Sequence, residues 1–152
     1  MARLNVLEYK ADFIRGWPHG EAVEMNYPSD VQFGNGDIVE IAADGKVVAA
    51  TDNTVTPAVI ARGAKDTFNG GGTGTNNLYT HSVPNICVFS NFVVRTSVVN
   101  ATGLVAGAQI GVVGGVWDVA ATAAVGTVLE VATNVPDANG DVQAAVAVIL
   151  VK

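Results

Sequence analysis

Short apolar segments that alternate with polar residues, separated by turn residues, fill the chain after Gly20. Alternation with a period of two is typical of half-buried β-strands, and Gly, Asn, Asp and Pro between the segments favour turns. The segments of this kind lie at residues 22–27, 37–43, 47–51, 56–63, 85–90, 91–99, 108–113, 116–122, 126–133 and 142–151. The pattern predicts an all-β fold, a compact antiparallel sandwich or barrel of about nine to ten short strands.

Two dipeptides predict hairpin turns. Asp44-Gly45 separates the second and third segments, and Asn139-Gly140 separates the last two. Because both residues of such a pair tolerate positive φ, we expect Asp44-Gly45 to form a two-residue type I′ turn. We expect an Asn-Gly hairpin at Asn139-Gly140 rather than the calcium loop that DANGD resembles, because the positions of Gly and Glu required by an EF-hand are absent.

An internal echo links the two halves of the chain. Residues 36–51 and 107–122 align without a gap and share the first Gly and the final Val-Ala-Ala-Thr, five matches in sixteen positions. Each stretch is expected to form a strand, a glycine turn and a second strand, followed by another apolar strand. Five matches can arise by chance in a chain so rich in Ala and Val, so the echo leaves a true repeat open.

The first twenty residues differ from the rest. They contain three of the eight basic residues, several large apolar side chains, and Pro18 with Gly20 at the end. Either a short helix or an extended arm fits this pattern, and its apolar bulk implies docking on this chain or on a neighbour. We therefore divide the chain into an N-terminal arm or helix at 1–20 and a single β domain at 21–152.

Charge is scarce in the second half. Charged residues make up 14% of the chain, and only five occur from residue 67 to residue 151. Such a stretch is typical of burial against partner chains, or of a well-filled core beneath a Ser/Thr/Asn surface. The net charge of −6 argues against nucleic-acid binding, which needs clustered Lys and Arg. Valine is the commonest residue, with 27 copies, which favours strands over helices.

No residue pattern predicts catalysis or a cofactor. The glycine-rich stretch 68–77 lacks the Lys of a phosphate-binding loop and precedes no helical pattern, so we expect an exposed connector without a ligand. The single Cys87 sits in an apolar run and is expected to be a small buried hydrophobe. Asp118 and Glu130 stand alone within apolar segments and are expected to face solvent. His19 and His81 have no metal-ligand spacing, so no metal site is predicted.

The sequence also predicts no membrane association. No apolar run reaches the ~20 residues needed to cross a bilayer, and the first residues show no uninterrupted apolar stretch typical of a signal peptide. We therefore expect synthesis in the cytoplasm.

GDIVEIAADGKVVAAT at residues 36–51, with the apolar strand after it, resembles the small β-rich decoration (cement) proteins of tailed-bacteriophage capsids. In that group a Gly-Asp opens a strand, a glycine turn follows, the next strand ends in small residues, and a valine-rich return strand closes the unit. The stretch 104–133 looks like the same unit again. The resemblance covers residues 34–62 and 104–133, and it carries over no catalytic residue.

This resemblance implies a structural virion protein on the outer capsid surface, a homotrimer that bridges capsomers and binds the major capsid protein. It implies no enzyme activity and no cofactor. Other virion components, such as a head-fibre base or a tail protein, and a carbohydrate-binding β domain remain alternatives. Large apolar and aromatic side chains are the partner-contact candidates, because such residues anchor interfaces. They are Leu7, Tyr9, Phe13, Ile14, Trp17 and Trp117.

Overall fold

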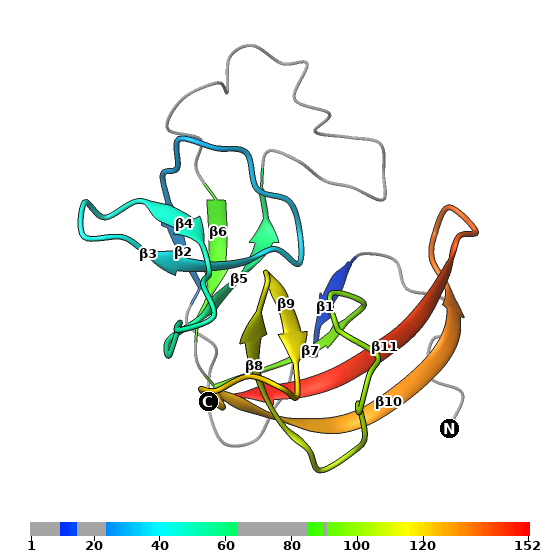
Figure 1. Cartoon of the computed structure of the whole chain (residues 1–152). Coiled ribbons are helices and arrows are strands. Elements are labelled where there is room, and N and C mark those ends of the chain that lie inside the picture. The colour runs from blue at the N-terminus through cyan, green and yellow to red at the C-terminus, as the bar shows by residue number, and fades with distance from the viewer. Residues whose placement is uncertain (1–9, 15–23, 64–84, 90) are drawn as a thin grey trace.

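In the part of the chain that the structure describes, eleven antiparallel strands lie in two sheets, which confirms the all-β prediction (Figure 1). The structure is a computed structural model that describes residues 10–14, 24–63, 85–89 and 91–152. The strands are β1 (Ala11–Phe13), β2 (Glu24–Tyr27), β3 (Ile38–Ile41), β4 (Val47–Ala49), β5 (Ala58–Arg62), β6 (Asn85–Val88), β7 (Phe92–Thr96), β8 (Gln109–Val113), β9 (Val116–Asp118), β10 (Gly126–Pro136) and β11 (Val142–Val151). Each of β2 to β11 lies in one predicted segment, except that β10 continues to Pro136, beyond the predicted end at residue 133. The segments form strands because their apolar side chains meet the faces that the sheets bury.

The two sheets have the same topology. One has the order β2-β6-β5-β3-β4, and the other has the order β1-β7-β11-β10-β8-β9. When β1 is set aside, each sheet consists of five strands that follow one another in the chain. In both sheets these five strands lie side by side in the order first, fifth, fourth, second, third. The protein therefore consists of two five-stranded units, which we call unit A (β2 to β6) and unit B (β7 to β11).

The backbone hydrogen bonds repeat in detail. The Gly36 N–H donates to the Ile60 carbonyl at 2.8 Å, and the Gly107 N–H donates to the Val128 carbonyl at 2.7 Å. Both glycines have positive φ, 87° and 89° respectively, which disfavours other residues. Directly after Ile60 and Val128, both return strands shift register at a β-bulge. The two units are thus a true structural repeat. The shared Gly of the sequence echo occupies equivalent positions, but the shared Val-Ala-Ala-Thr is displaced by one residue between the units, because Val48 pairs as Asp118 does.

The turn at Asp44-Gly45 differs from the prediction. The Ala42 N–H donates to the Lys46 carbonyl at 2.8 Å, and the Gly45 N–H donates to the Ala42 carbonyl at 2.9 Å. Only Gly45 within this turn has positive φ, 82°, so the loop has three residues and the expected two-residue type I′ turn was wrong. A three-residue loop needs one left-handed residue instead of two, which spares Asp44 that conformation.

The hairpin at Asn139-Gly140 is confirmed, and it has the same three-residue form. The Asp137 N–H donates to the Asp141 carbonyl at 2.8 Å, and the Gly140 N–H donates to the Asp137 carbonyl at 3.0 Å. The turn joins β10 and β11, the two longest strands, which form a curved ribbon along one side of the molecule (Figure 1).

The main hydrophobic core draws on both units. Trp117 and Ile149 of unit B are fully buried in one cluster that also contains Ile38 and Val59 of unit A. A second cluster lies within unit A, where Ile60 packs with residues of β3, β4 and β6. The alternating side chains of β5 thus enter two different cores. Burial of each Ile or Val side chain stabilises the fold by about 1.5–3 kcal/mol.

One side-chain amide connects the two sheets across β1. Asn35 lies in the turn before β3, and its Oδ1 accepts a hydrogen bond from the Ala11 N–H at 2.8 Å. Its Nδ2 donates to the Ala11 carbonyl at 2.9 Å and to the Ala61 carbonyl at 3.1 Å. The amide therefore takes the place of a neighbouring strand on the edge of β1 that faces away from β7, and it links β1 to β5.

Replacement of Asn35 by Ala should destabilise the protein by roughly 2–4 kcal/mol, because it leaves buried backbone groups of Ala11 and Ala61 without partners. Chemical denaturation monitored by circular dichroism measures the change. Asn53→Ala, at an exposed loop position, is the matched control and should shift the free energy of unfolding by about 0.5 kcal/mol or less. Equal stability of Asn35→Ala and the wild type would show that the bridge is dispensable.

Candidate functional site

The described residues contain no assembled chemical centre. Within residues 10–14, 24–63, 85–89 and 91–152, no three His, Cys, Asp or Glu side chains lie together in a way that could hold a metal ion. His19, His81 and the glycine-rich stretch 68–77 lie outside the described residues. Individual buried polar groups and the surface are the remaining candidate features of these residues.

Cys87 is a buried hydrophobic residue, as expected from its apolar surroundings. It lies in β6 at 0% exposure, within the second core cluster of unit A. Burial raises the pKa of the Cys87 thiol to about 11, because the thiolate loses its hydration there. The side chain remains protonated at neutral pH, and only the thiolate is a nucleophile.

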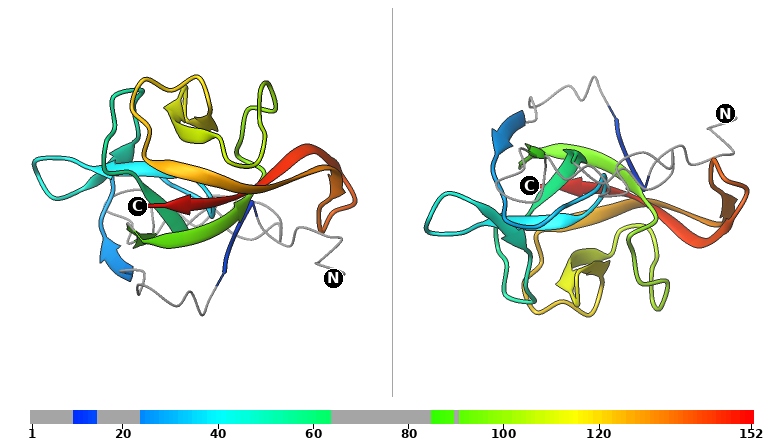
Figure 2. Two further views of the ribbon diagram at one scale, coloured as in Figure 1. Left: turned by 90° about the horizontal axis from the view of Figure 1, so that it is seen from below. Right: turned by 90° about the horizontal axis from the view of Figure 1, so that it is seen from above.

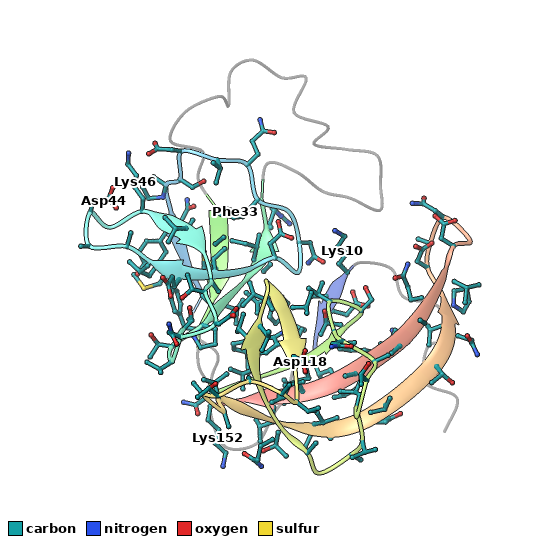
Figure 3. All side chains as sticks on the ribbon, viewed as in Figure 1. Lys10, Phe33, Asp44, Lys46, Asp118 and Lys152 are labelled. Carbon is teal, nitrogen blue, oxygen red and sulfur yellow. The ribbon has the colours of Figure 1, made fainter. Side chains whose placement is uncertain are left out.

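Asp118 corrects a sequence interpretation, because it does not face solvent. Its side chain is buried at the end of β9 (Figure 3). One carboxylate oxygen accepts a hydrogen bond from Asn100 Nδ2, and the other accepts one from the Ala120 N–H, both at 2.8 Å. The carboxylate fixes the segment before unit B's first hairpin to the turn that follows it. Glu130 is exposed, as expected.

Asp137 has a structural role at the tip of the β10–β11 ribbon. Its Oδ1 accepts hydrogen bonds from the Asn139 and Asp141 N–H groups at 2.9 and 3.0 Å. Its Oδ2 accepts one from Gln143 Nε2 at 3.0 Å. The carboxylate is 5% exposed and is directed inward at the turn's own donors, an arrangement that stabilises a hairpin.

The partner-contact candidates predicted from the sequence differ in their exposure, and some of them lie outside the described residues. Leu7, Tyr9 and Trp17 lie outside the described residues. Phe13 of β1 is half-buried and packs edge-to-face on Phe92 with ring centroids 5.7 Å apart. Ile14, directly after β1, is 38% exposed.

Trp117 corrects the interpretation as a contact residue. Its side chain is 0% exposed within a single chain, at the centre of the main core. A ring enclosed by its own chain offers no surface to a partner, so Trp117 is a core anchor. The sequence could not separate these roles, because a tryptophan beside a glycine turn occurs at both core and interface positions.

Exposed apolar side chains are the surface feature that the sequence reasoning missed. They lie on β2, the β2–β3 connection, the β3–β4 hairpin, the loop after β4, the β7–β8 connection and the β10–β11 ribbon. The most exposed are Met25 (49%), Val31 (55%), Val55 (66%), Val105 (59%) and Val142 (63%). Single exposed valines are common on proteins, so their position relative to the two units decides their meaning.

Comparisons of the chain with protein-family models, with curated proteins and with solved structures found no match. Among the residues that the structure describes, no helix has the length and apolar character needed to span a membrane.

The burial of Cys87 predicts slow reaction with thiol reagents. In the native protein at pH 8, Cys87 should react with a disulfide reagent at least about 100-fold more slowly than in denaturant, because its thiol is both protonated and enclosed. Absorbance of the released thiolate measures both rates. A native rate close to the denatured one would contradict the placement of Cys87 in the core.

Proposed function

We propose that the protein is a non-enzymatic structural protein of a bacteriophage virion, which decorates the outer surface of the capsid and stabilises it by bridging capsomers. The observation that carries the proposal is the lack of surface charge on unit B. Of the charged residues in this unit, Arg95, Asp118 and Asp137 are 9%, 6% and 5% exposed. Glu130 and Asp141 are the exposed ones.

A nearly uncharged β surface suits permanent contact with other proteins. Interface centres are depleted of charged residues, since each buried charge must lose its hydration. A sheet surface of small and β-branched residues can be covered with little such cost. This favours burial against partner chains over the alternative of an ordinary polar surface above a filled core.

The duplicated architecture also supports the proposal. The residues on which the resemblance to capsid decoration proteins rests, 34–62 and 104–133, include β3 to β5 of unit A and β8 to β10 of unit B. These are equivalent parts of the two units, with matching hydrogen bonds and bulges. The repeated turn-and-strand pattern in the sequence therefore corresponds to a repeated structural element.

In this proposal the major capsid protein and further copies of this chain are the partners. The β body associates as a homotrimer on the capsid surface, and residues 1–20 contact the shell. Ile14 is the exposed apolar side chain at the described end of this segment. The carbohydrate-binding alternative has less support, because the ring of Trp117 is buried and cannot form part of a sugar platform.

Deletion of residues 1–9 tests the contact with the shell and leaves β1 in place. The shortened chain should bind expanded capsids, assembled from the major capsid protein of the same genome, at least about tenfold more weakly, because it loses several apolar side chains and the basic Arg3. Co-sedimentation over a range of concentrations measures the affinity. The thermal unfolding midpoint is the control and should stay unchanged.

Two outcomes would contradict the proposal. Full-length protein that fails to bind these capsids would refute the decoration role. Unchanged affinity of the shortened chain would refute the role of the first nine residues.

A further inference from the structure

The two units differ at one sheet edge. In unit B, the outer edge of β7 is covered by β1, with Ala11 opposite Thr96 and Phe13 opposite Val94. The equivalent strand in unit A is β2, which pairs with β6 as β7 pairs with β11. Among the described residues, no strand pairs with the outer edge of β2.

The pairing gives the correspondence residue by residue. Residues 25–27 of β2 hold the positions that residues 94–96 hold in β7. Val94, Arg95 and Thr96 are at most 9% exposed beside β1. Met25 is 49% exposed, and Asn26 is exposed as well. Among the described residues, unit A thus has no sixth strand at the edge that β1 covers in unit B, and Met25 and Asn26 are exposed there.

The register also shows which backbone groups of β2 face this open edge. On β7, the groups of alternate residues face β1: the Val93 carbonyl accepts from the Ile14 N–H at 2.9 Å, and the Ser97 N–H donates to the Lys10 carbonyl at 3.1 Å. Arg95 lies midway between Val93 and Ser97 in the chain, so its N–H and carbonyl also face β1. Its equivalent is Asn26, so the N–H and carbonyl of Asn26 are directed away from β6.

A second surface is buried in unit A and open in unit B. The turn at residues 34–37 is closed by a hydrogen bond from the Asp37 N–H to the Gly34 carbonyl at 3.1 Å. The equivalent turn at residues 105–108 is closed by the Ala108 N–H and the Val105 carbonyl at 3.2 Å. The first turn packs against β1 through Asn35, and its first three residues are buried. The first three residues of the second turn are exposed, and Val105 is 59% exposed.

The third residue of each turn shows the same contrast. A Cβ on Gly36 would lie 2.9 Å from Lys10 Cβ, so the glycine permits the close approach of β1. A Cβ on Gly107 would meet no atom within 4 Å. Unit B therefore repeats the backbone of the turn, including its left-handed glycine, at a place where no described residue packs against that glycine.

The contact between the units thus has two sides, a sheet edge and a turn. Unit B contributes its edge and unit A contributes its turn, with β1 between them. The exposed edge of β2 and the exposed turn lie on opposite sides of the molecule, so they cannot meet within one chain (Figure 2). We propose that the edge of β2 in one copy binds the turn at residues 105–108 of a second copy, a direct contact between the counterparts of the two surfaces that β1 joins within one chain.

The chemistry of the two surfaces is compatible. The turn is Val-Ala-Gly-Ala and carries no charge, and Glu24 is the one charged residue of β2. Their contact therefore places no like charges opposite each other. Because Ala106 lacks the amide of Asn35, backbone groups of the turn supply the hydrogen bonds to Asn26. An interface between two different surfaces is head-to-tail, and it closes into a ring when the rotation between copies allows.

This inference rests on the self-association proposed above but not on capsid binding. All measurements use the free protein, so their failure is distinguishable from failure to bind capsids.

Two variants test the two sides separately. Asn26→Pro removes the outward N–H and leaves the pairing of Met25 and Tyr27 with β6 in place. Val105→Lys places a charge in the turn. Multi-angle light scattering and sedimentation equilibrium should find a closed oligomer for the wild type and a monomer for each variant. Val55→Lys, at an equally exposed valine outside both surfaces, is the control and should retain the oligomer.

A mixture of the variants tests the head-to-tail geometry. The Asn26→Pro chain retains an intact turn, and the Val105→Lys chain retains an intact β2 edge. An equimolar mixture should therefore form a one-to-one dimer, whereas an interface between identical surfaces would give no such complementation. Circular dichroism and the thermal midpoint of each variant establish that both chains are folded before they are mixed.

The proposal would be overturned by a wild-type protein that is monomeric at 100 μM, on the order of the highest working concentration. It would also be overturned by folded variants that retain the wild-type mass, or by a mixture that contains only monomers.

Discussion

The amide of Asn35 closes the edge of β1 and thereby holds the two five-stranded units together. A single side chain replaces a strand, since it accepts from one N–H and donates to two carbonyls that are otherwise buried without partners. β1 has three residues and comes from the far end of the chain, so its pairing with β7 alone would be weak. β1 lies between β7 and the turn of unit A and thereby joins the two units. The shared core around Trp117 lies next to β1.

The duplication accounts for the strand order, the bulges and the turns that the two units share. Each unit uses the same turn, the same bulge in its return strand and the same strand order. The units diverge in their first hairpin, which has a three-residue loop in unit A and the two-residue turn Gly114-Gly115 in unit B. They diverge again where they connect their fourth and fifth strands. Unit B uses the tight turn stabilised by Asp137, whereas unit A carries an insertion that contains the glycine-rich stretch. The contact between the units uses the edge of β7 and the turn of unit A. The equivalent edge of β2 and the equivalent turn of unit B are not used in this contact.

The surface of unit B carries little charge, which supports the proposed contact with other proteins. Three of its five charges are buried, and Asp118 and Asp137 use their carboxylates to fix local backbone. Most of the charge in unit B is therefore used to fix local backbone, and only Glu130 and Asp141 of its charged residues are exposed. This distribution could not be predicted from the sequence, where Asp118 and Glu130 stand in similar apolar surroundings and yet have opposite exposure.

The sequence by itself determined the fold class, the position of nearly every strand and the burial of Cys87. These depend on local alternation, on β-branched side chains and on turn residues, which act over a few neighbouring positions. The tertiary structure alone decided that the two halves are a structural repeat, that β1 joins unit B, and that Trp117 belongs to the core. It also decided the length of the turn at Gly45. Each of these depends on contacts between residues distant in sequence, such as Asn35 with Ala11 and Ala61, and no local pattern records which distant edge a strand will meet.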